Sequence, residues 1–265
     1  MQKINVFWFR RDLRLHDNCG LYHALNSGLP VLAFFLFDKN ILDDIEEKND
    51  ARLSFLHQEL SSINQQLISK GSKLLTYYES PQNAFKNLIE AYSIQNIFTN
   101  KDYEPYAIKR DLKIKAFLKK NGIPFFSYKD QVIFEENEIV KADGSPYLVY
   151  TPYSKKWLSS VTNEMLAPFK SGLDFENWFK TAASKIIPLN TLGFENSEVN
   201  IPSKSIANET LHLYESERNY PAKDSTSKLG VHLRFGTLSI RDLYRKSEKL
   251  SAVYFKELIW REFFM

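Results

Sequence analysis

The sequence predicts an α/β protein, with a doubly wound parallel sheet, a long connecting segment and the beginning of an all-α domain. Three observations support this prediction. Short apolar runs alternate with amphipathic stretches over the first 130 residues, prolines and glycines break the pattern as far as Pro202, and helical periodicity returns from Tyr214. We therefore expect an α/β domain over residues 1–130, a linker with short helices over 131–202, and the start of a helical domain over 203–265.

Five strands and four helices are expected in the first segment. Ile4–Phe9 and Val31–Phe37 are unbroken apolar runs, which are typical of strands buried on both faces. Weaker strand patterns follow at Lys73–Tyr78, Asn96–Thr99 and Pro124–Tyr128. The amphipathic stretches between them predict helices over Asn18–Ser27, Asp50–Lys70, Pro81–Tyr92 and Tyr106–Lys120. Strands joined through helices pair in parallel, so helices should cover both faces of the sheet.

Helix boundaries have recognisable signals. Gly71 and Gly122 follow helical patterns at the position where a left-handed cap residue is favoured. In the last segment, Gly236 should end one helix and Ser239–Asp242 resembles the capping box that begins the next. The final apolar helix, Ser251–Met265, stops without a polar exit. We therefore expect the chain to be part of a longer one.

Composition excludes several classes of protein. With 43% hydrophobic residues among 265, the chain is neither disordered nor a short disulfide scaffold. Its apolar runs are too short to cross a membrane. The single cysteine, Cys19, allows no internal disulfide and no cysteine-based zinc site, which fits a reducing cytosol. The net charge of +3, all from residues 201–265, permits an anionic partner. The 38 aromatic residues indicate either a large core or a surface that stacks planar ligands.

The turn after the first strand is unusually charged. It contains Arg10, Arg11, Asp12, Arg14 and Asp17, and it lacks both the glycine fingerprint for dinucleotides and a Walker loop. Ligands of doubly wound sheets bind beyond the carboxyl ends of the strands. The charges could therefore contact a ligand, but an ion-pair lattice that holds the turn is the favoured interpretation.

An ordered set of motifs points to a family. These are Trp8–Asn18, Ala51-Arg52, Asp102–Tyr106 with Arg110-Asp111, Thr151–Tyr153, Arg218–Pro221, Thr226–Gly230, His232–Gly236 and Glu257–Phe263. Together they resemble the DNA photolyase/cryptochrome family, and are most similar to the photolyases of cyclobutane pyrimidine dimers. The resemblance implies an α/β domain that can hold a light-harvesting antenna, followed by a helical domain that binds FAD. It also implies a cytoplasmic, monomeric enzyme acting on damaged DNA, without a membrane or a metal.

The resemblance assigns most candidate site residues to the last 52 positions. FAD contacts are implied for Tyr214, Thr226, Ser227, Lys228, Leu229, Gly230, Tyr254, Glu257 and Arg261. Independently, two hydroxyls ahead of a helix suit a phosphate, although such a pair is more often only an N-cap. Contacts to the lesion are implied for Glu257, Trp260 and Arg218, with Glu257 as the catalytic residue. Without the resemblance, Glu257 and Arg261 would be an ordinary i,i+4 ion pair.

Two questions remain open from the sequence. Arg11, Arg52, Asp102 and Glu104 match antenna positions, and Tyr106-Ala107 replaces the Asn-Glu of folate-binding relatives. A flavin-type or deazaflavin antenna, or none, is therefore expected rather than folate. The leading function is repair of cyclobutane dimers; a cryptochrome-type photoreceptor and a (6–4) photolyase are the alternatives. Because other family flavin contacts would follow Met265, we expect the 265-residue chain alone to bind FAD weakly or not at all, and to be inactive.

Overall fold

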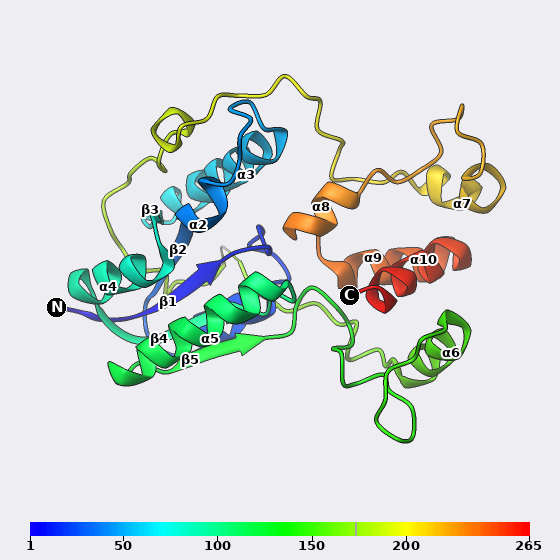
Figure 1. Cartoon of the computed structure of the whole chain (residues 1–265), viewed down its shortest axis with the longest axis horizontal. Helices are drawn as coiled ribbons and strands as arrows, with labels where there is room; N and C mark the ends of the chain where they lie inside the picture. Colours follow the sequence, from blue (N-terminus) through cyan, green and yellow to red (C-terminus); the bar gives the residue numbers. More distant parts are fainter. Residues whose placement is uncertain (173) are drawn as a thin grey trace. The chain divides into compact units, whose positions relative to one another are not determined.

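The computed structural model describes residues 1–172 and 174–265 and divides the chain into two compact units (Figure 1). The first unit combines Met1–Tyr128 with Phe169–Ile201, and the second combines Lys129–Pro168 with Pro202–Met265. The segment 131–202, expected as a linker, is thus shared between the two units.

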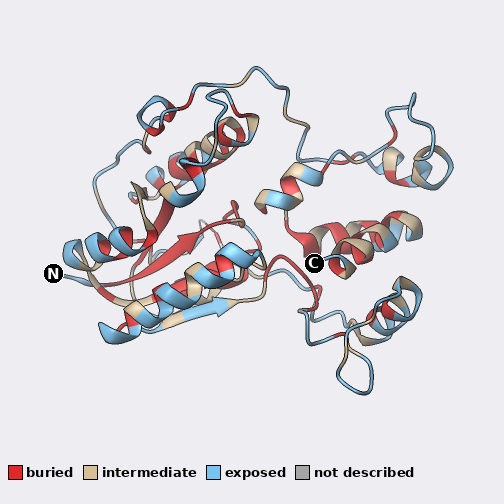
Figure 2. Ribbon diagram, viewed as in Figure 1, coloured by how far each residue is buried: buried red, intermediate tan, exposed pale blue. Residues whose placement is uncertain are grey.

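The first unit is built on a five-stranded parallel sheet. Its strands are β1 (Lys3–Phe9), β2 (Val31–Asp38), β3 (Leu74–Glu79), β4 (Ser93–Asn100) and β5 (Phe125–Tyr128). Their order is β3-β2-β1-β4-β5, and every pairing is parallel, which confirms the predicted doubly wound sheet. Figure 2 shows β1 and β2 almost entirely buried, as their unbroken apolar sequences predict, whereas the edge strand β5 is largely exposed.

Helices cover both faces of this sheet. They are α1 (Cys19–Leu25), α2 (Lys39–Leu42), α3 (Ala51–Ile68), α4 (Pro81–Ala91) and α5 (Pro105–Lys120). The connections run from β1 to β3 in one direction and from β3 to β4 in the other, so right-handed crossovers place α1 and α3 opposite α4 and α5. On the second face, the Trp8 and Phe34 rings pack edge-on against Phe85 of α4, at 4.9 and 5.8 Å between ring centroids. The short α2 has no counterpart in the sequence prediction.

The irregular segment contributes to both units. Helix α6 (Tyr150–Ser160) lies in this segment and belongs to the second unit. A 3₁₀ turn of the same segment, Leu189–Leu192, belongs to the first, where Trp178 forms a parallel bridge with Val31 at the start of β2. The chain therefore returns to the sheet before it enters the last helices.

The second unit is helical. Besides α6 it contains α7 (Asn208–Glu217), α8 (Gly230–Phe235), α9 (Ile240–Leu250) and α10 (Ala252–Phe263). Its core includes Trp157, whose ring stacks on Tyr244 at 5.0 Å. The predicted boundaries are confirmed: Gly236 ends α8 with a φ of 64°, and the Ser239 side chain accepts from the amides of Arg241 and Asp242 at the start of α9. Within the described residues, no helix has the length and apolar character needed to span a bilayer.

Candidate functional site

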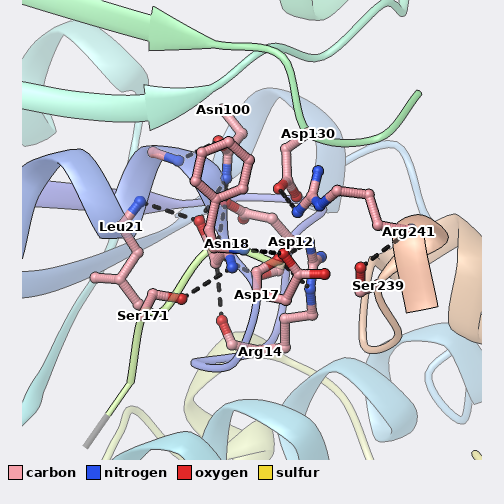
Figure 3. Close-up of polar contacts among 12 residues, drawn as sticks. Asp12, Arg14, Asp17, Asn18, Leu21, Asn100, Asp130, Ser171, Ser239 and Arg241 are labelled. Carbon is pink, nitrogen blue, oxygen red and sulfur yellow. Dashed lines mark hydrogen bonds and ion pairs between the residues drawn. The ribbon is translucent and has the colours of Figure 1, made fainter. Parts of the chain in front are cut away.

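The charged turn after β1 is a buried polar network within the first unit (Figure 3). The Asp12 carboxylate accepts from the Arg10 amide at 2.7 Å and from the Asn100 side chain at 2.6 Å. The Asn18 side chain accepts from the Leu21 amide at 3.0 Å and so caps α1. The Arg10 guanidinium pairs with Asp111 of α5. These contacts confirm the structural interpretation of the motif, because its charges hold β1, β4 and α1 together.

Asn100, at the end of β4, is the residue of this network that the sequence analysis missed. Its side chain donates to Asp12 and to Asn18, at 2.6 and 2.8 Å, and accepts from the Gly20 amide at 2.8 Å. A single side-chain amide thus satisfies two residues of the loop between β1 and α1 and one residue of α1. An asparagine that ends a buried strand next to a charged turn is the only signal the sequence carries for it.

Three of the four antenna candidates lie together. The Arg11 guanidinium is 3.2 Å from the Asp102 carboxylate and 3.1 Å from that of Glu104. Arg52 instead pairs with Asp50, which caps α3, and the Arg52 side chain is 69% exposed. The structure therefore brings Arg11 together with Asp102 and Glu104, whereas Arg52 pairs separately at the start of α3.

A groove of about 540 Å³ runs between α4 and α5, and Tyr106, Lys109, Lys113 and Phe117 are among the residues that line it. The Tyr106 hydroxyl donates to the Asp38 carboxylate at 2.6 Å. Burial, and then this hydrogen bond, raise the pKa of Tyr106 to about 12. Tyr106 is therefore a fixed, neutral donor at this position.

In the second unit, α7 and α10 bring four candidate residues together. The Tyr214 and Tyr254 rings meet edge to face at 5.0 Å, and the Arg218 guanidinium lies 5.5 Å from the Tyr214 ring centre. One turn further along each helix, Arg218 forms an ion pair with Glu257. We call Tyr214, Arg218, Tyr254 and Glu257 the α7–α10 cluster. The ion pair of Glu257 thus joins two helices, whereas the sequence suggested a partner on its own helix.

The α7–α10 cluster is buried at one end and open at the other. Tyr254 is 4% exposed and belongs to the core, whereas the side chains of Arg218 and Glu257 are 31% and 36% exposed. The hydrogen bond with Glu257 raises the pKa of Arg218 above its already high value, so the guanidinium stays ionised. The accessible end therefore offers one carboxylate and one guanidinium to a ligand.

Trp260, the lesion-stacking candidate, is already in a ring stack. Its indole lies parallel to the Tyr150 ring of α6, with centroids 3.6 Å apart and an interplanar angle of 7°. Phe264 stacks on it at 5.5 Å. Trp260 is half-buried, unlike the fully buried Trp8, Trp157 and Trp178. The sequence analysis did not assign a role to Tyr150, which adjoins the Thr151–Tyr153 motif.

The predicted phosphate loop, Thr226–Gly230, forms an exposed turn held by one buried residue. Leu229 is fully buried, whereas Thr226, Lys228 and Gly230 are exposed. Lys228 has a φ of 52°, and a Cβ atom added to Gly230 would meet nothing within 4 Å. Ser227 hydrogen-bonds to Tyr254, which links the loop to the α7–α10 cluster. Helix α8 begins at Gly230, at the end of the motif, and is only six residues long.

Two residues of the motif on α10, Arg261 and Glu262, contact the segment that precedes α6. The Arg261 guanidinium donates to the Gln131 carbonyl oxygen at 2.9 Å. The Glu262 carboxylate accepts from the Ile133 and Phe134 amides and from the Trp157 indole N–H, the last at 2.8 Å. Burial raises the pKa of Glu262 to about 7 although all three donors oppose the shift. Glu262 therefore joins α10 to α6 and to the segment before it, a structural role that the sequence analysis did not assign although the motif contains this residue.

A second buried charge pair lies in the same unit. The Arg241 guanidinium is 2.9 Å from the Asp130 carboxylate, and both side chains are at most 3% exposed (Figure 3). It ties the start of α9 to the segment before α6. Among the described residues, no set of three or more histidine, cysteine and carboxylate side chains is arranged to hold a metal ion.

Comparisons with known proteins agree with this architecture. The DNA photolyase family model matches residues 5–171, more than half of the chain. A deoxyribodipyrimidine photo-lyase of Synechococcus is 29% identical over 98% of the chain. Cryptochrome-2 of Arabidopsis thaliana is 30% identical over 63% of the chain and 28% of its own length. The crystal structure of an archaeal photolyase from Sulfolobus tokodaii with two FAD molecules superposes on the whole chain with a TM-score of 0.79 and 27% identity.

The chain spans 59% of the Synechococcus protein and 58% of the Sulfolobus structure. The match nonetheless covers the parallel sheet, the helices on both of its faces and the β1 turn network described above. The chain therefore belongs to the DNA photolyase family.

Proposed function

We propose that this protein repairs cyclobutane pyrimidine dimers in DNA by light-driven electron transfer from FAD. The observation that carries the proposal is the pairing of Arg218 with Glu257 one turn away from the half-buried indole of Trp260. These are the residues for which the family motifs imply contact with the lesion, and the fold brings them from two helices to one surface of the second unit.

The residues present fit a flavin dinucleotide. The exposed turn Thr226–Gly230 offers two hydroxyls, the Lys228 ammonium and open space beside Gly230, which together suit a pyrophosphate. The half-buried Tyr214 ring packs against Tyr254, which in turn hydrogen-bonds to Ser227 of this turn. We propose that these residues, with Arg261, hold the cofactor. When bound and reduced, FAD supplies the photoexcited electron that opens the cyclobutane ring.

The accessible residues suit a crosslinked pyrimidine pair. The Glu257 carboxylate can accept from the N–H groups of the two bases, and Arg218 holds that carboxylate in place. The Trp260 indole offers an apolar stacking surface, worth about 1–3 kcal/mol per base in comparable sites. A dimer is already poorly stacked in the duplex, so extruding it costs less than extruding normal bases.

The other parts of the proposal concern the antenna and the assembly. We propose that Arg11, Asp102 and Glu104 contact an antenna of flavin or deazaflavin type, because these three side chains converge whereas Arg52 lies with Asp50. We propose that the protein acts on DNA as a monomer, with the surplus of positive charge in residues 201–265 favouring the phosphate backbone.

The test compares binding of an oligonucleotide that carries one thymine dimer with binding of its undamaged twin. Trp260→Ala should weaken binding of the damaged strand about 5- to 150-fold, because about 1–3 kcal/mol of stacking is lost. Glu257→Gln should weaken it about 5- to 12-fold, since replacing a hydrogen bond to a charged group by a neutral one loses about 1–1.5 kcal/mol. Glu248→Gln, an exposed carboxylate on α9, is the matched control and should bind as the unmodified chain does.

Repair is then measured by illuminating the damaged oligonucleotide with the full-length protein and reduced FAD. Light-dependent loss of the dimer that requires Glu257 supports the proposal. Binding without any preference for the dimer would instead favour the second candidate, a cryptochrome-type photoreceptor. The similarity to Cryptochrome-2 supports this second candidate.

A further inference from the structure

The stack between Tyr150 and Trp260 is unusually close for two side chains. Ring pairs in proteins prefer centroid separations of about 4.5–7 Å in offset or edge-to-face arrangements. Here the centroids are 3.6 Å apart and the rings nearly parallel, at 7°. One face of the Trp260 indole is therefore covered by the Tyr150 ring.

Tyr150 is fixed by contacts that are independent of the stack. Its hydroxyl donates to the Lys256 carbonyl oxygen at 3.0 Å, one turn before Trp260 on α10. Burial, and then the nearby Glu257 carboxylate, raise the pKa of Tyr150, so the hydroxyl keeps the proton it donates. The ring is thus anchored to the same helix that carries the indole.

The two helices that carry the rings are joined through the core. On α6, Tyr153 and Trp157 are buried, and the Trp157 indole N–H donates to Glu262 of α10 at 2.8 Å. The position of Tyr150 over Trp260 is therefore set by packing, while the pair itself stays at the half-buried edge of the unit.

We propose that Tyr150 is a positioning residue that holds the Trp260 indole in one orientation for stacking on the extruded lesion. The inference rests on the proposed function. Phe264 also stacks on the indole, at 5.5 Å, but the Tyr150 ring lies closer, at 3.6 Å, and more nearly parallel. The Tyr150 ring therefore limits the rotamers of this half-buried side chain, and ordering a side chain on binding reduces affinity about 2- to 12-fold. Tyr150 removes that cost before the DNA arrives.

The experiment uses three variants of the chain and two readouts. Tyr150→Ala removes the ring, Tyr150→Phe removes only the hydroxyl anchor, and Leu148→Ala truncates a neighbouring side chain that is 82% exposed. The first readout is acrylamide quenching of Trp260 fluorescence, obtained by subtracting the signal of Trp260→Phe. The second is the affinity for damaged and undamaged oligonucleotides.

Tyr150→Ala should at least double the quenching constant of Trp260 and weaken binding of the damaged strand about 2- to 12-fold, without changing binding of the undamaged one. Tyr150→Phe should show the same changes at smaller amplitude, and its retained ring guards against misfolding. Leu148→Ala should change neither readout.

Unchanged quenching in Tyr150→Ala overturns the inference, whatever the DNA results. Equal loss of damaged and undamaged binding also overturns it, because Tyr150 would then contact DNA directly. If the unmodified chain does not prefer damaged DNA, the proposed function fails, and the role of Tyr150 in lesion binding fails with it. A higher quenching constant in Tyr150→Ala would then show only that Tyr150 supports the indole.

Discussion

Glu262 offers the sharpest test of how the second unit is held together. The carboxyl group is completely buried, and its pKa in the folded protein is raised from 4.5 to about 7. Between these two values, the unfolded chain releases the Glu262 proton while the folded protein retains it. The unfolded state thus binds fewer protons, and the free energy of unfolding falls as the pH rises through this interval.

The magnitude follows from the two pKa values. One pKa unit corresponds to about 1.4 kcal/mol, so Glu262 should make the second unit about 3 kcal/mol less stable at pH 8 than at pH 4. Glu262→Gln cannot ionise and should lose this contribution. The free energy of unfolding of the unmodified chain, minus that of the variant, should therefore decrease by about 3 kcal/mol over this range.

The measurement is urea unfolding followed by tryptophan fluorescence at several pH values. Trp157 reports on the relevant unit, because its indole N–H donates to Glu262. Glu248→Gln removes an exposed carboxylate from the neighbouring helix α9 and should leave the pH profile unchanged. A difference that stays constant, or that grows with pH, would refute the reasoning, since the three N–H donors would then outweigh the cost of burying the charge.

Two further substitutions probe the buried contacts of each unit. Gly20→Ala would place a Cβ atom 2.9 Å from the Thr99 carbonyl oxygen, and should lower the free energy of unfolding of the first unit in urea by about 1–3 kcal/mol. Gly230→Ala is the control: its Cβ atom meets nothing within 4 Å, so the free energy of unfolding should not change. Equal stability of the two variants would contradict the tight fit around Gly20. Asp130→Asn removes one counter-ion of the buried Arg241 guanidinium and should destabilise the second unit by about 3–5 kcal/mol in the same assay. A loss below about 1 kcal/mol would show that this pair contributes little.

The sequence predicted most of the first unit because its signals are local. Unbroken apolar runs follow from burial on both faces, and the start and end of helices depend on nearby side chains such as Ser239 and Gly236. The four-residue α2 was missed because a single turn is too short to show periodicity. The division of residues 131–202 between two units carries no local signal, since it depends on pairings such as Val31 with Trp178.

The candidate site was found differently, through motifs that resemble a known family rather than through periodicity. The motifs indicated which residue types matter, but not which of them meet. Glu257 could pair with Arg261 on its own helix as far as spacing shows, yet the ion pair that the structure records is with Arg218, 39 positions earlier. Tyr150 and Asn100 escaped notice because their importance lies in contacts with residues about 80 to 110 positions away.

By itself, the sequence determined the parallel sheet, its helices and the family, because the pattern of apolar residues and the order of short motifs are written along the chain. Only the tertiary structure decided that the charged turn after β1 is a closed polar network, that Trp260 rests on Tyr150, and that Glu262 is buried among three donors. The reason is physical: a buried charge or a stacked ring is defined by the partners that surround it, and those partners come from distant parts of the chain.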